Sequence, residues 1–347
     1  MKGGAPGLLS AEVRQYFIRR ALLVIPTVLG VTLLITLLLQ ILQGDIADQI
    51  FAESATFNQE LTKEKIKDDL GINDKVLGSR FLGIFKQWGE WVGGVAHGDF
   101  GEYFRSRKSV GGELQNRIPV TLELSGLALF FSLVIALPIG VISAIRQDTL
   151  VDHTARSFSI FMLALPSFWL GTLYFVIVGH WRDWGLPQSV GDWLLPPSQY
   201  KDFWEDPEAN IRQMWAPAAI LGFALAGSVM RLTRSQMLEV LRQDYVRTAW
   251  SKGLRERTVV IRHAIKNAFI PVFSLIGVQI AILVSGSVVL ERIFGLPGLG
   301  LMLIEAVSQR EYVAVQGVLL VVAILVVLTN FVVDMVYSLL DPRIRYA

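Results

Sequence analysis

The 347-residue sequence contains no cysteine and has few charged residues for its length. Without cysteine, the chain forms no disulfide and uses no thiolate as a metal ligand or as a nucleophile. Charged residues make up 18% of the sequence, whereas soluble globular proteins contain about 25%. Hydrophobic residues account for 52%. The shortage of charge therefore predicts a protein whose solvent is in part a lipid bilayer.

Patterns that mark enzymes are missing as well. The sequence has no G-x-x-x-x-G-K-[ST] loop for nucleotide phosphates, no H-E-x-x-H motif and no G-x-S-x-G motif. Its histidines have no metal-ligand spacing, and we expect surface or interface roles for them. These histidines are His97, His153, His180 and His263. We therefore expect no catalytic residue and no metal site, and we do not expect an enzyme.

Six apolar segments are long enough, or nearly long enough, to cross a bilayer, which takes roughly 17–25 residues. They are 21–42, 122–145, 158–178, 214–230, 268–290 and 314–333. Prolines lie in or near several of them, and neighbouring helices make proline tolerable in membrane helices. These prolines are Pro26, Pro138, Pro166 and Pro271. The sequence predicts an all-α, polytopic membrane protein with six transmembrane helices, the first of which is a retained anchor rather than a signal peptide.

Basic residues gather in the segments that an inside N-terminus would place in the cytoplasm. The segment 231–267 alone carries nine lysines and arginines against three acids. Since cytoplasmic loops of membrane proteins are rich in Lys and Arg, we predict that both termini lie in the cytoplasm. The expected divisions are a cytoplasmic segment 1–20, a first transmembrane helix 21–43, an outer loop 44–118 and a core domain 119–347.

The outer loop 44–118 contains two helix signals. Glu60–Leu70 predicts a short charged helix that Gly71 closes, and apolar residues follow at helical spacing between Phe81 and Val95. That second helix would either lie in the membrane interface or pack on the transmembrane helices, and both alternatives stay open. The other long outer loop, 180–213, is rich in Trp, Pro and Asp and has no pattern that indicates chemistry.

The polar segment 231–267 contains one short helix signal. Asp244 is a good N-cap, Gly253 suits the left-handed residue that ends a helix, and Lys252 sits where the helix dipole favours a cation. Such a helix would be about 12 Å long and too short to persist without a packing partner. Its narrow apolar face therefore needs another surface. That face consists of Val246, Ala249, Trp250 and Gly253.

Five stretches, in order along the chain, carry a family resemblance. They are Phe17–Pro26, Gly98–Gly101 with Arg117–Leu124, Asp244–Gly253 with Arg262–Pro271, Phe294–Gly300, and Leu340–Tyr346. In these stretches the chain resembles permeases of bacterial ATP-binding-cassette (ABC) importers, most of all the B-type permease of the dipeptide/oligopeptide family. The third stretch resembles that family's EAA signature. Trp250 and Ser251 depart from the Arg-Ala pair that is usual before Lys-Gly in the signature.

The resemblance implies a type I ABC importer permease fold and a multi-pass transport subunit of the bacterial inner membrane. Such a subunit forms half of a path for short peptides, which alternating access opens as ATP is hydrolysed on partner chains. The resemblance implies no cofactor on this chain, with ATP and Mg on two partner ATPases. Further partners would be a second homologous permease, a periplasmic or lipid-anchored substrate-binding protein and membrane lipid, but no nucleic acid.

Two candidate sites come with the resemblance. The first is a coupling helix that docks in a groove of the ATPase. Its residues are Asp244, Tyr245, Val246, Arg247, Thr248, Ala249, Trp250, Lys252, Gly253 and Leu254. The second is an outer-loop motif whose glycines and proline form tight turns; it serves an outer gate, or it packs against the sixth span. Its residues are Phe294, Gly295, Pro297, Gly298 and Gly300.

Polar side chains inside the apolar segments are candidates for the translocation path, because such residues face the bundle interior or a water-filled cavity. They are Ser125, Ser132, Gln279, Ser285 and Asn330. Glu123 and Asp334 lie near segment ends, where we expect pairing with other protein groups.

Other functions stay open. Members of the wider family move nickel, glutathione or oligosaccharides, and the sequence does not decide among these substrates. A stand-alone secondary transporter would show inverted repeats and paired charges at mid-membrane depth. A membrane enzyme or scaffold would need reactive residues clustered at one depth. The sequence shows neither feature.

Overall fold

The computed structural model describes residues 11–42, 80–181 and 183–340. In this part of the chain the structure consists of helices and one isolated β-bridge, between Glu102 and Ser109. The predicted all-α fold is confirmed. The helix expected at Glu60–Leu70 lies outside the described residues, as does the C-terminal stretch from Asp341.

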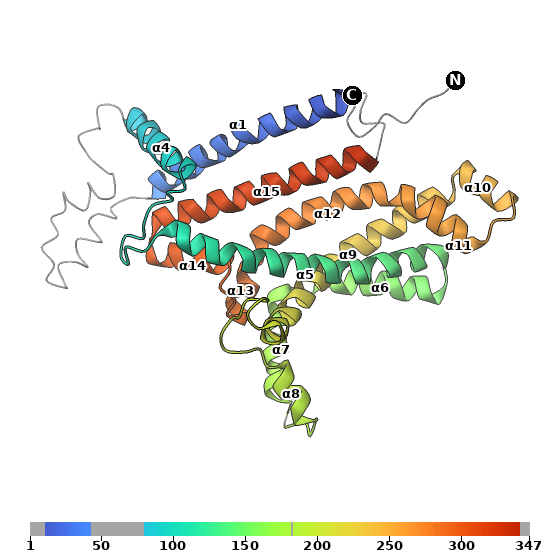
Figure 1. Cartoon of the computed structure of the whole chain (residues 1–347). Helices are drawn as coiled ribbons and strands as arrows, with labels where there is room; N and C mark the ends of the chain where they lie inside the picture. The colour runs from blue at the N-terminus through green and yellow to red at the C-terminus, as the bar shows by residue number, and fades with distance from the viewer. Residues whose placement is uncertain (1–10, 43–79, 182, 341–347) are drawn as a thin grey trace, which may run out of the picture. The chain divides into compact units, whose positions relative to one another are not determined.

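The described helices fall into long and short ones (Figure 1). The long helices are α1 (Ala11–Leu42), α5 (Val110–Ile145), α9 (Pro207–Leu241), α12 (Lys266–Gly286) and α15 (Tyr312–Leu340). The short helices are α4 (Arg80–Ala96), α6 (Leu150–Ala164), α7 (Ser167–Gly179), α8 (Gln188–Leu194), α10 (Asp244–Ser251), α11 (Glu256–Thr258), the π-helix Val259–Ile265, α13 (Val288–Phe294) and α14 (Leu299–Gln309). Among the described residues, five helices are long and apolar enough to cross a membrane, or six crossings if α6 and α7 form one.

Polar caps begin α5 and α9 well before the apolar segments that predicted these helices. Ser109 accepts a hydrogen bond from the backbone N–H of Gly112 at 3.3 Å, so α5 starts at Val110 rather than at residue 122. Asp206 accepts one from the N–H of Ala209 at 3.1 Å, so α9 starts at Pro207. Hydropathy therefore marked only the apolar part of each helix.

The third predicted span, 158–178, is not one continuous helix in the structure. The structure divides it into α6 and α7, which meet at an angle of 92°. Leu165 adopts an extended conformation before Pro166, with φ −89° and ψ 120°. Steric contact with a proline ring drives the preceding residue out of the helical region, and the proline has no N–H for a helical hydrogen bond across the break.

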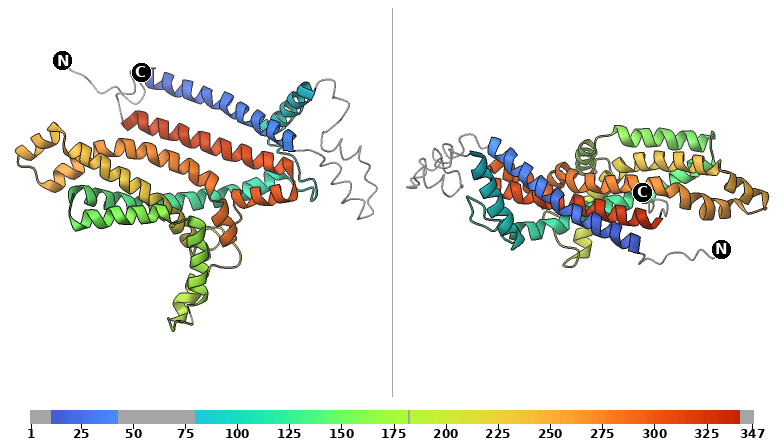
Figure 2. Two further views of the ribbon diagram at one scale, coloured as in Figure 1. Left: turned by 180° about the vertical axis from the view of Figure 1, so that it is seen from behind. Right: turned by 90° about the horizontal axis from the view of Figure 1, so that it is seen from above.

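Contacts divide the chain into two compact units, and the first contains residues 1–21, 116–304 and 325–347. Within it, α9 packs against α6 and against α12. Figure 2 shows these helices side by side from two further directions, with α10 at their far end. Arg20 and Asp334 form an ion pair, as expected for a charge near the end of a span.

An aromatic cluster holds α7 and α13 on α9 in this unit. The ring centroids of Phe175 and Phe294 lie 4.9 Å apart, and that of Tyr174 lies 5.5 Å from Phe294 and 5.9 Å from Trp215. Aromatic pairs at such distances add to the stability that burial of their area provides. The cluster therefore fixes α13, and with it the start of the outer-loop motif.

The second unit contains residues 22–115 and 305–324. The predicted helix between Phe81 and Val95 is confirmed as α4. The indole N–H of Trp88 donates to the hydroxyl of Thr32 in α1 at 3.0 Å, which favours packing on a membrane helix over the interfacial alternative. The buried carboxylate of Glu311 accepts the backbone N–H groups of Phe104 and Arg105 at 2.6 and 3.0 Å.

Candidate functional site

The short helix of the EAA-like segment is present as α10, with a different start from the one predicted. Its N-cap is Gln243, which makes no side-chain capping bond, and Asp244 is the first helical residue. The helix ends as predicted at Gly253, which has φ +73°. Gly253 N–H donates to the carbonyl of Trp250 at 2.9 Å and Leu254 N–H to that of Ala249 at 3.4 Å. These two bonds form a Schellman motif.

The apolar stripe that we expected to meet a partner is already covered by the chain itself. Val246 is fully buried, and Ala249 is 6% exposed. Both pack with Val259 of the π-helix and with Val240 and Leu241 at the end of α9. Two of the four residues of the predicted docking face therefore pack inside the chain, whereas Trp250 and Gly253 are exposed. A helix of eight residues has too few internal hydrogen bonds to persist alone, and intramolecular packing is what holds it.

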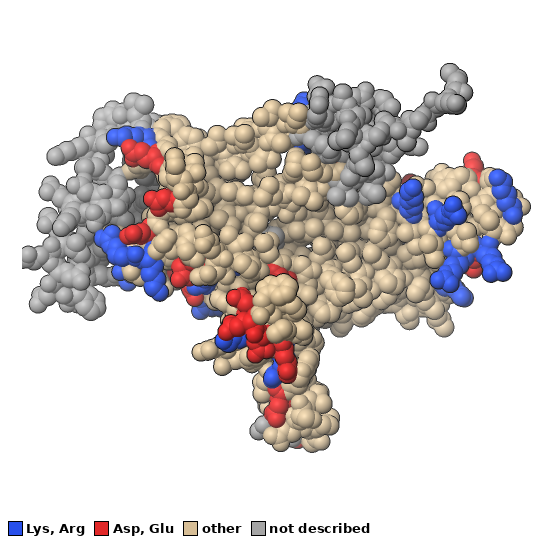
Figure 3. Space-filling view, viewed as in Figure 1, with Lys and Arg blue, Asp and Glu red and all other residues tan. Residues whose placement is uncertain are grey.

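Exposed apolar side chains flank this buried stripe, and we call them the α10 rim. They are Tyr245, Trp250 and Leu254, with exposed fractions of 43%, 43% and 38%. The other predicted residues of this site are exposed as well. They are Asp244, Arg247, Thr248, Lys252 and Gly253. Figure 3 shows Lys and Arg gathered over α10 and α11 at this end of the first unit.

The segment between α10 and α12 contains a feature that the sequence did not indicate, a π-helix over Val259–Ile265. Such helices are rare and concentrate at functional sites. The side-chain amide of Asn267 donates to the Tyr245 hydroxyl at 2.8 Å. The first turn of α10 is thereby tied to the first turn of α12.

The outer-loop motif is built around a carboxylate that sequence reasoning missed. Glu291 is fully buried in α13. The hydroxyls of Thr121 and Ser287 donate to its Oε1 at 3.0 and 2.6 Å, and the N–H of Leu301 donates to its Oε2 at 2.9 Å. The Thr121 hydroxyl also accepts the N–H of Leu299 at 2.8 Å. We call this arrangement the Glu291 cage. The available signal was an acid that, with Arg292, interrupts the apolar run 288–294.

The glycines of the motif leave the space that this carboxylate fills. A Cβ on Gly298 would lie 2.4 Å from the Glu291 carboxyl carbon, and a Cβ on Gly300 would lie 2.6 Å from the Cα of Val288. Gly295 ends α13 in the left-handed conformation, with φ +65°. Phe294 is buried in the aromatic cluster. The motif therefore packs α5, α13 and α14 together. An outer gate and contact with the sixth span both stay predictions.

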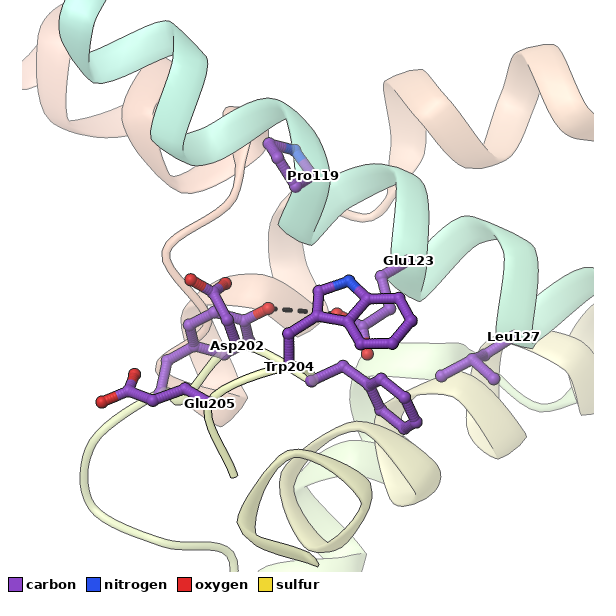
Figure 4. A pocket seen from close by; sticks show the side chains of 8 residues that line it. Pro119, Glu123, Leu127, Asp202, Trp204 and Glu205 are labelled. Carbon is purple, nitrogen blue, oxygen red and sulfur yellow. Dashed lines mark hydrogen bonds between the residues drawn. The ribbon is translucent and has the colours of Figure 1, made fainter. Parts of the chain in front are cut away.

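On the other side of the same turn of α5, an open pocket of about 890 Å³ lies between the helix and the loop that precedes α9. Figure 4 shows Pro119 and Glu123 of α5 facing Asp202, Trp204 and Glu205 of the loop. The remaining lining residues are Leu127, Tyr200 and Phe203. Acids and aromatic side chains thus share one pocket, and the loop 180–213 contributes most of them.

Two hydrogen bonds fix Glu123 in this pocket, and both reach the same oxygen. The Tyr200 hydroxyl and the Asn210 amide donate to Oε2 at 3.0 and 3.3 Å. Burial and the Glu123 carboxylate raise the pKa of the Tyr200 hydroxyl, which therefore stays a donor at neutral pH. The expected pairing of Glu123 with protein groups is thus present. Among the described residues, Oε1 has no hydrogen-bond donor.

A second buried carboxylate lies near the other end of α5. Asp152 is fully buried in α6, and Arg234 of α9 binds it through two nitrogens, each at 2.7 Å. Ser143 of α5 donates to the same carboxylate at 2.6 Å, and the N–H of Asp148 donates at 3.0 Å. The charged pair therefore joins α5, α6 and α9. In the described part of the chain, no three histidine or acidic side chains gather closely enough to hold a metal ion.

Of the four path candidates whose side chains the structure describes, three are buried and one is exposed. Ser125 and Ser132 of α5 are buried. The amide of Gln279 is also buried and donates to the Ser228 hydroxyl of α9 at 2.6 Å. Asn330 is exposed, and the side chain of Ser285 lies outside the described ones.

Comparisons with known proteins agree with this fold and motif arrangement. A family profile described as "Binding-protein-dependent transport system inner membrane component" matches residues 136–346. The chain is 35% identical over 346 residues to the dipeptide transport system permease protein DppB of Escherichia coli strain K12, an alignment that covers 96% of this chain and 99% of that protein. It is 37% identical over 342 residues to the di/tripeptide transport system permease protein DppB of Pseudomonas aeruginosa strain UCBPP-PA14, with 96% and 99% covered.

A solved structure supports the fold. A chain of the MetNI methionine ABC transporter, in an inward-facing conformation, superimposes with a TM-score of 0.52 at 16% identity. The match covers 66% of this chain and 96% of that one. The fold, the profile match and the near full-length relatives lead to one conclusion: the chain belongs to the family of binding-protein-dependent transport system inner membrane components.

Proposed function

We propose that the chain is the permease subunit of an ABC importer and forms half of a path for short peptides across the bacterial inner membrane. The observation that carries this proposal is the near full-length similarity to two permeases named for dipeptide and di/tripeptide transport, at 35% and 37% identity. No observation favours nickel, glutathione, oligosaccharide or a stand-alone secondary transporter, so peptides are the substrate class proposed.

In the proposed assembly the chain pairs with a second, homologous permease within the lipid bilayer. Two ATPase subunits hold ATP and Mg on the cytoplasmic side, and a substrate-binding protein delivers peptide on the outer side. Both chain termini are cytoplasmic in this arrangement. The gathering of Lys and Arg over α10 and α11 supports this orientation (Figure 3), because basic residues favour the cytoplasmic side.

The proposed ATPase contact is the α10 rim with its basic neighbours. Val246 and Ala249 serve as the internal support that holds α10 in place, since both are buried against the chain itself. Trp250 offers a large exposed ring, and such aromatic side chains are enriched among the residues that dominate binding energy. Arg247 and Lys252 are placed to steer an acidic partner surface.

For the translocation path, Asn330 is the strongest of the five candidates. A path shared by two permeases is lined by residues on the surface of each, and the Asn330 side chain is exposed whereas Ser125, Ser132 and Gln279 are buried. Alternating access would bring such a residue to each side of the membrane in turn.

The test is reconstitution of the chain with its neighbouring permease, ATPase and binding-protein gene products in proteoliposomes. We expect ATP-dependent uptake of labelled dipeptide that requires every component. Uptake that needs no ATPase subunit, or uptake of nickel or sugars in place of peptides, would contradict the proposal.

A further inference from the structure

The charge of the residues that line the pocket at Glu123 indicates which kind of ligand it binds. Acidic residues line it from two elements, Glu123 from α5 and Asp202 and Glu205 from the loop before α9. Among the described residues no lysine, arginine or histidine lines it. Lys201, which is adjacent in sequence, forms an ion pair with Glu205 at 2.7 Å. Among the described residues Glu123 and Asp202 have no such pair, and these two acids favour a cation in the pocket.

Aromatic side chains form the rest of the wall. Trp204 is 91% exposed and Phe203 is 40% exposed, so their rings have few neighbours within the chain to pack on. Indole faces attract cations electrostatically, through the quadrupole of the ring. Carboxylates next to exposed aromatic rings therefore suit an organic ammonium group better than a bare metal ion. Room is ample, because the pocket measures about 890 Å³.

Glu123 presents an unoccupied acceptor oxygen to such a group. Tyr200 and Asn210 fix its side chain through Oε2, and within the described chain Oε1 accepts no hydrogen bond. An ammonium group has three donors and no acceptor, so it complements the vacant oxygen directly. Of the three acids that line the pocket, Glu123 belongs to the membrane helix α5, and Asp202 and Glu205 belong to the loop.

We propose that this pocket binds the α-ammonium group of the transported peptide, with Glu123 as the hydrogen-bonded anion and Trp204 as the aromatic face. The inference rests on the proposed peptide transport, and it adds a contact to the substrate on the permease itself. The same turn of α5 carries Thr121 of the Glu291 cage on its other side. The cage thereby holds the ammonium site in place.

The experiment measures binding to the importer without its binding protein, reconstituted in nanodiscs. The ligands are Ala-Ala, N-acetyl-Ala-Ala, which has no ammonium group, and Ala-Ala amide, which keeps it. Saturation-transfer NMR titrations give apparent dissociation constants. We expect Ala-Ala and its amide to bind at least about tenfold more tightly than the acetylated peptide, as for a charge-assisted hydrogen bond.

Variants then locate the contact. Glu123→Gln keeps the shape and the acceptor oxygen for Tyr200, and it should bring the tenfold ratio close to one. Trp204→Ala should weaken Ala-Ala binding about threefold, as for an exposed cation–π contact. Glu208→Gln, an exposed acid in the first turn of α9 that does not line the pocket, should leave the ratio unchanged.

Several outcomes would overturn the assignment. Equal binding of Ala-Ala and its acetylated form, in an importer that does transport dipeptide, would refute the ammonium site and leave the proposed function standing. An unchanged ratio in Glu123→Gln would do the same. If that variant lost only its affinity for the binding protein, the pocket would be a protein contact instead. Failure of the wild-type importer to take up any peptide would contradict the proposed function.

Discussion

Two fully buried carboxylates lie near opposite ends of α5, and their surroundings differ. Asp152 meets a charged partner, because two nitrogens of Arg234 lie 2.7 Å from its oxygens. Glu291 meets hydroxyl and backbone N–H groups, and the glycines of the outer-loop motif enclose it. The first site is a charged pair to which Ser143 and the N–H of Asp148 also donate, whereas the second holds its carboxylate with uncharged hydroxyl and backbone N–H donors.

The Asp152 site and the Glu291 site therefore depend on different features of the fold. At the Asp152 site the groups come from three helices, with Arg234 on α9, Ser143 on α5 and the acid itself on α6, so the site depends on how these helices pack. At the Glu291 site the carboxylate bonds to its own turn and to α5, so the site depends on the conformation of that turn. We expect a change of charge to matter most at the first site and a change of volume at the second.

Removing Arg234 should have the largest effect on stability. Arg234→Leu leaves the Asp152 charge buried without its cation, which should lower the free energy of unfolding by about 3–5 kcal/mol. Denaturation of the purified protein in detergent measures this. The double variant Asp152→Asn with Arg234→Leu should recover most of the loss, because no charge is left buried. If single and double variants are equally unstable, the pair has no special role.

Adding a methyl group inside the Glu291 cage should cause the second largest loss of stability. Gly298→Ala places a Cβ 2.4 Å from the Glu291 carboxyl carbon, and the surrounding turn cannot yield, so we expect a loss of about 2–3 kcal/mol. Gly126→Ala in α5 is the control, since nothing lies within 4 Å of the added carbon there. A Gly298→Ala variant as stable as that control would show that the cage is soft and would end the contrast between the two sites.

Removing one hydrogen-bonding group from the Glu291 cage should lower the free energy of unfolding by a smaller amount. Thr121→Val removes the hydroxyl that donates to Glu291 and accepts from Leu299, and leaves a buried N–H unpaired, at about 1–2 kcal/mol. Thr172→Val provides a matched change on an exposed surface, where the hydroxyl bonds only within its own helix. The two variants should differ by more than about 1 kcal/mol in the same denaturation assay.

A change at the α10 rim should barely alter stability. Trp250→Ala removes a side chain that is 43% exposed, so the free energy of unfolding should stay within about 0.5 kcal/mol. Affinity for the ATPase subunit should instead fall about tenfold, as for an aromatic residue at the centre of an interface. Trp184→Ala, exposed on a different segment, should change neither quantity. Unchanged ATPase affinity in Trp250→Ala would remove the rim from the docking surface.

The sequence was sufficient to predict features that depend on local chemistry. The end of α10 at Gly253 followed from the conformational freedom of glycine, and the helix between Phe81 and Val95 followed from apolar spacing. The all-α fold followed from the long apolar segments. Each of these depends on residues close together in the chain.

Features that depend on tertiary contacts were not predictable. Pro138 remains within α5, whereas the chain bends at Pro166. Both follow a leucine in apolar sequence, so no local signal separates them. What differs is packing: Gly171, one turn beyond the bend, lies close against Leu290 of α13, where a Cβ would come within 2.8 Å. Likewise, nothing local indicated that Val246 and Ala249 meet Val259 rather than a partner.

The bend at Leu165–Pro166 has a mechanical consequence. In a continuous helix, the backbone hydrogen bonds transmit a displacement along the helix axis. These hydrogen bonds are interrupted between α6 and α7. α6 contains Asp152 and is linked through it to α9, while α7 rests on α13 beside Glu291. The bent pair is thus divided into a part linked to α9 and a part linked to α13. Because the two parts share no helical hydrogen-bond ladder at the bend, a displacement of α6 is not transmitted to α7 along a common helix axis.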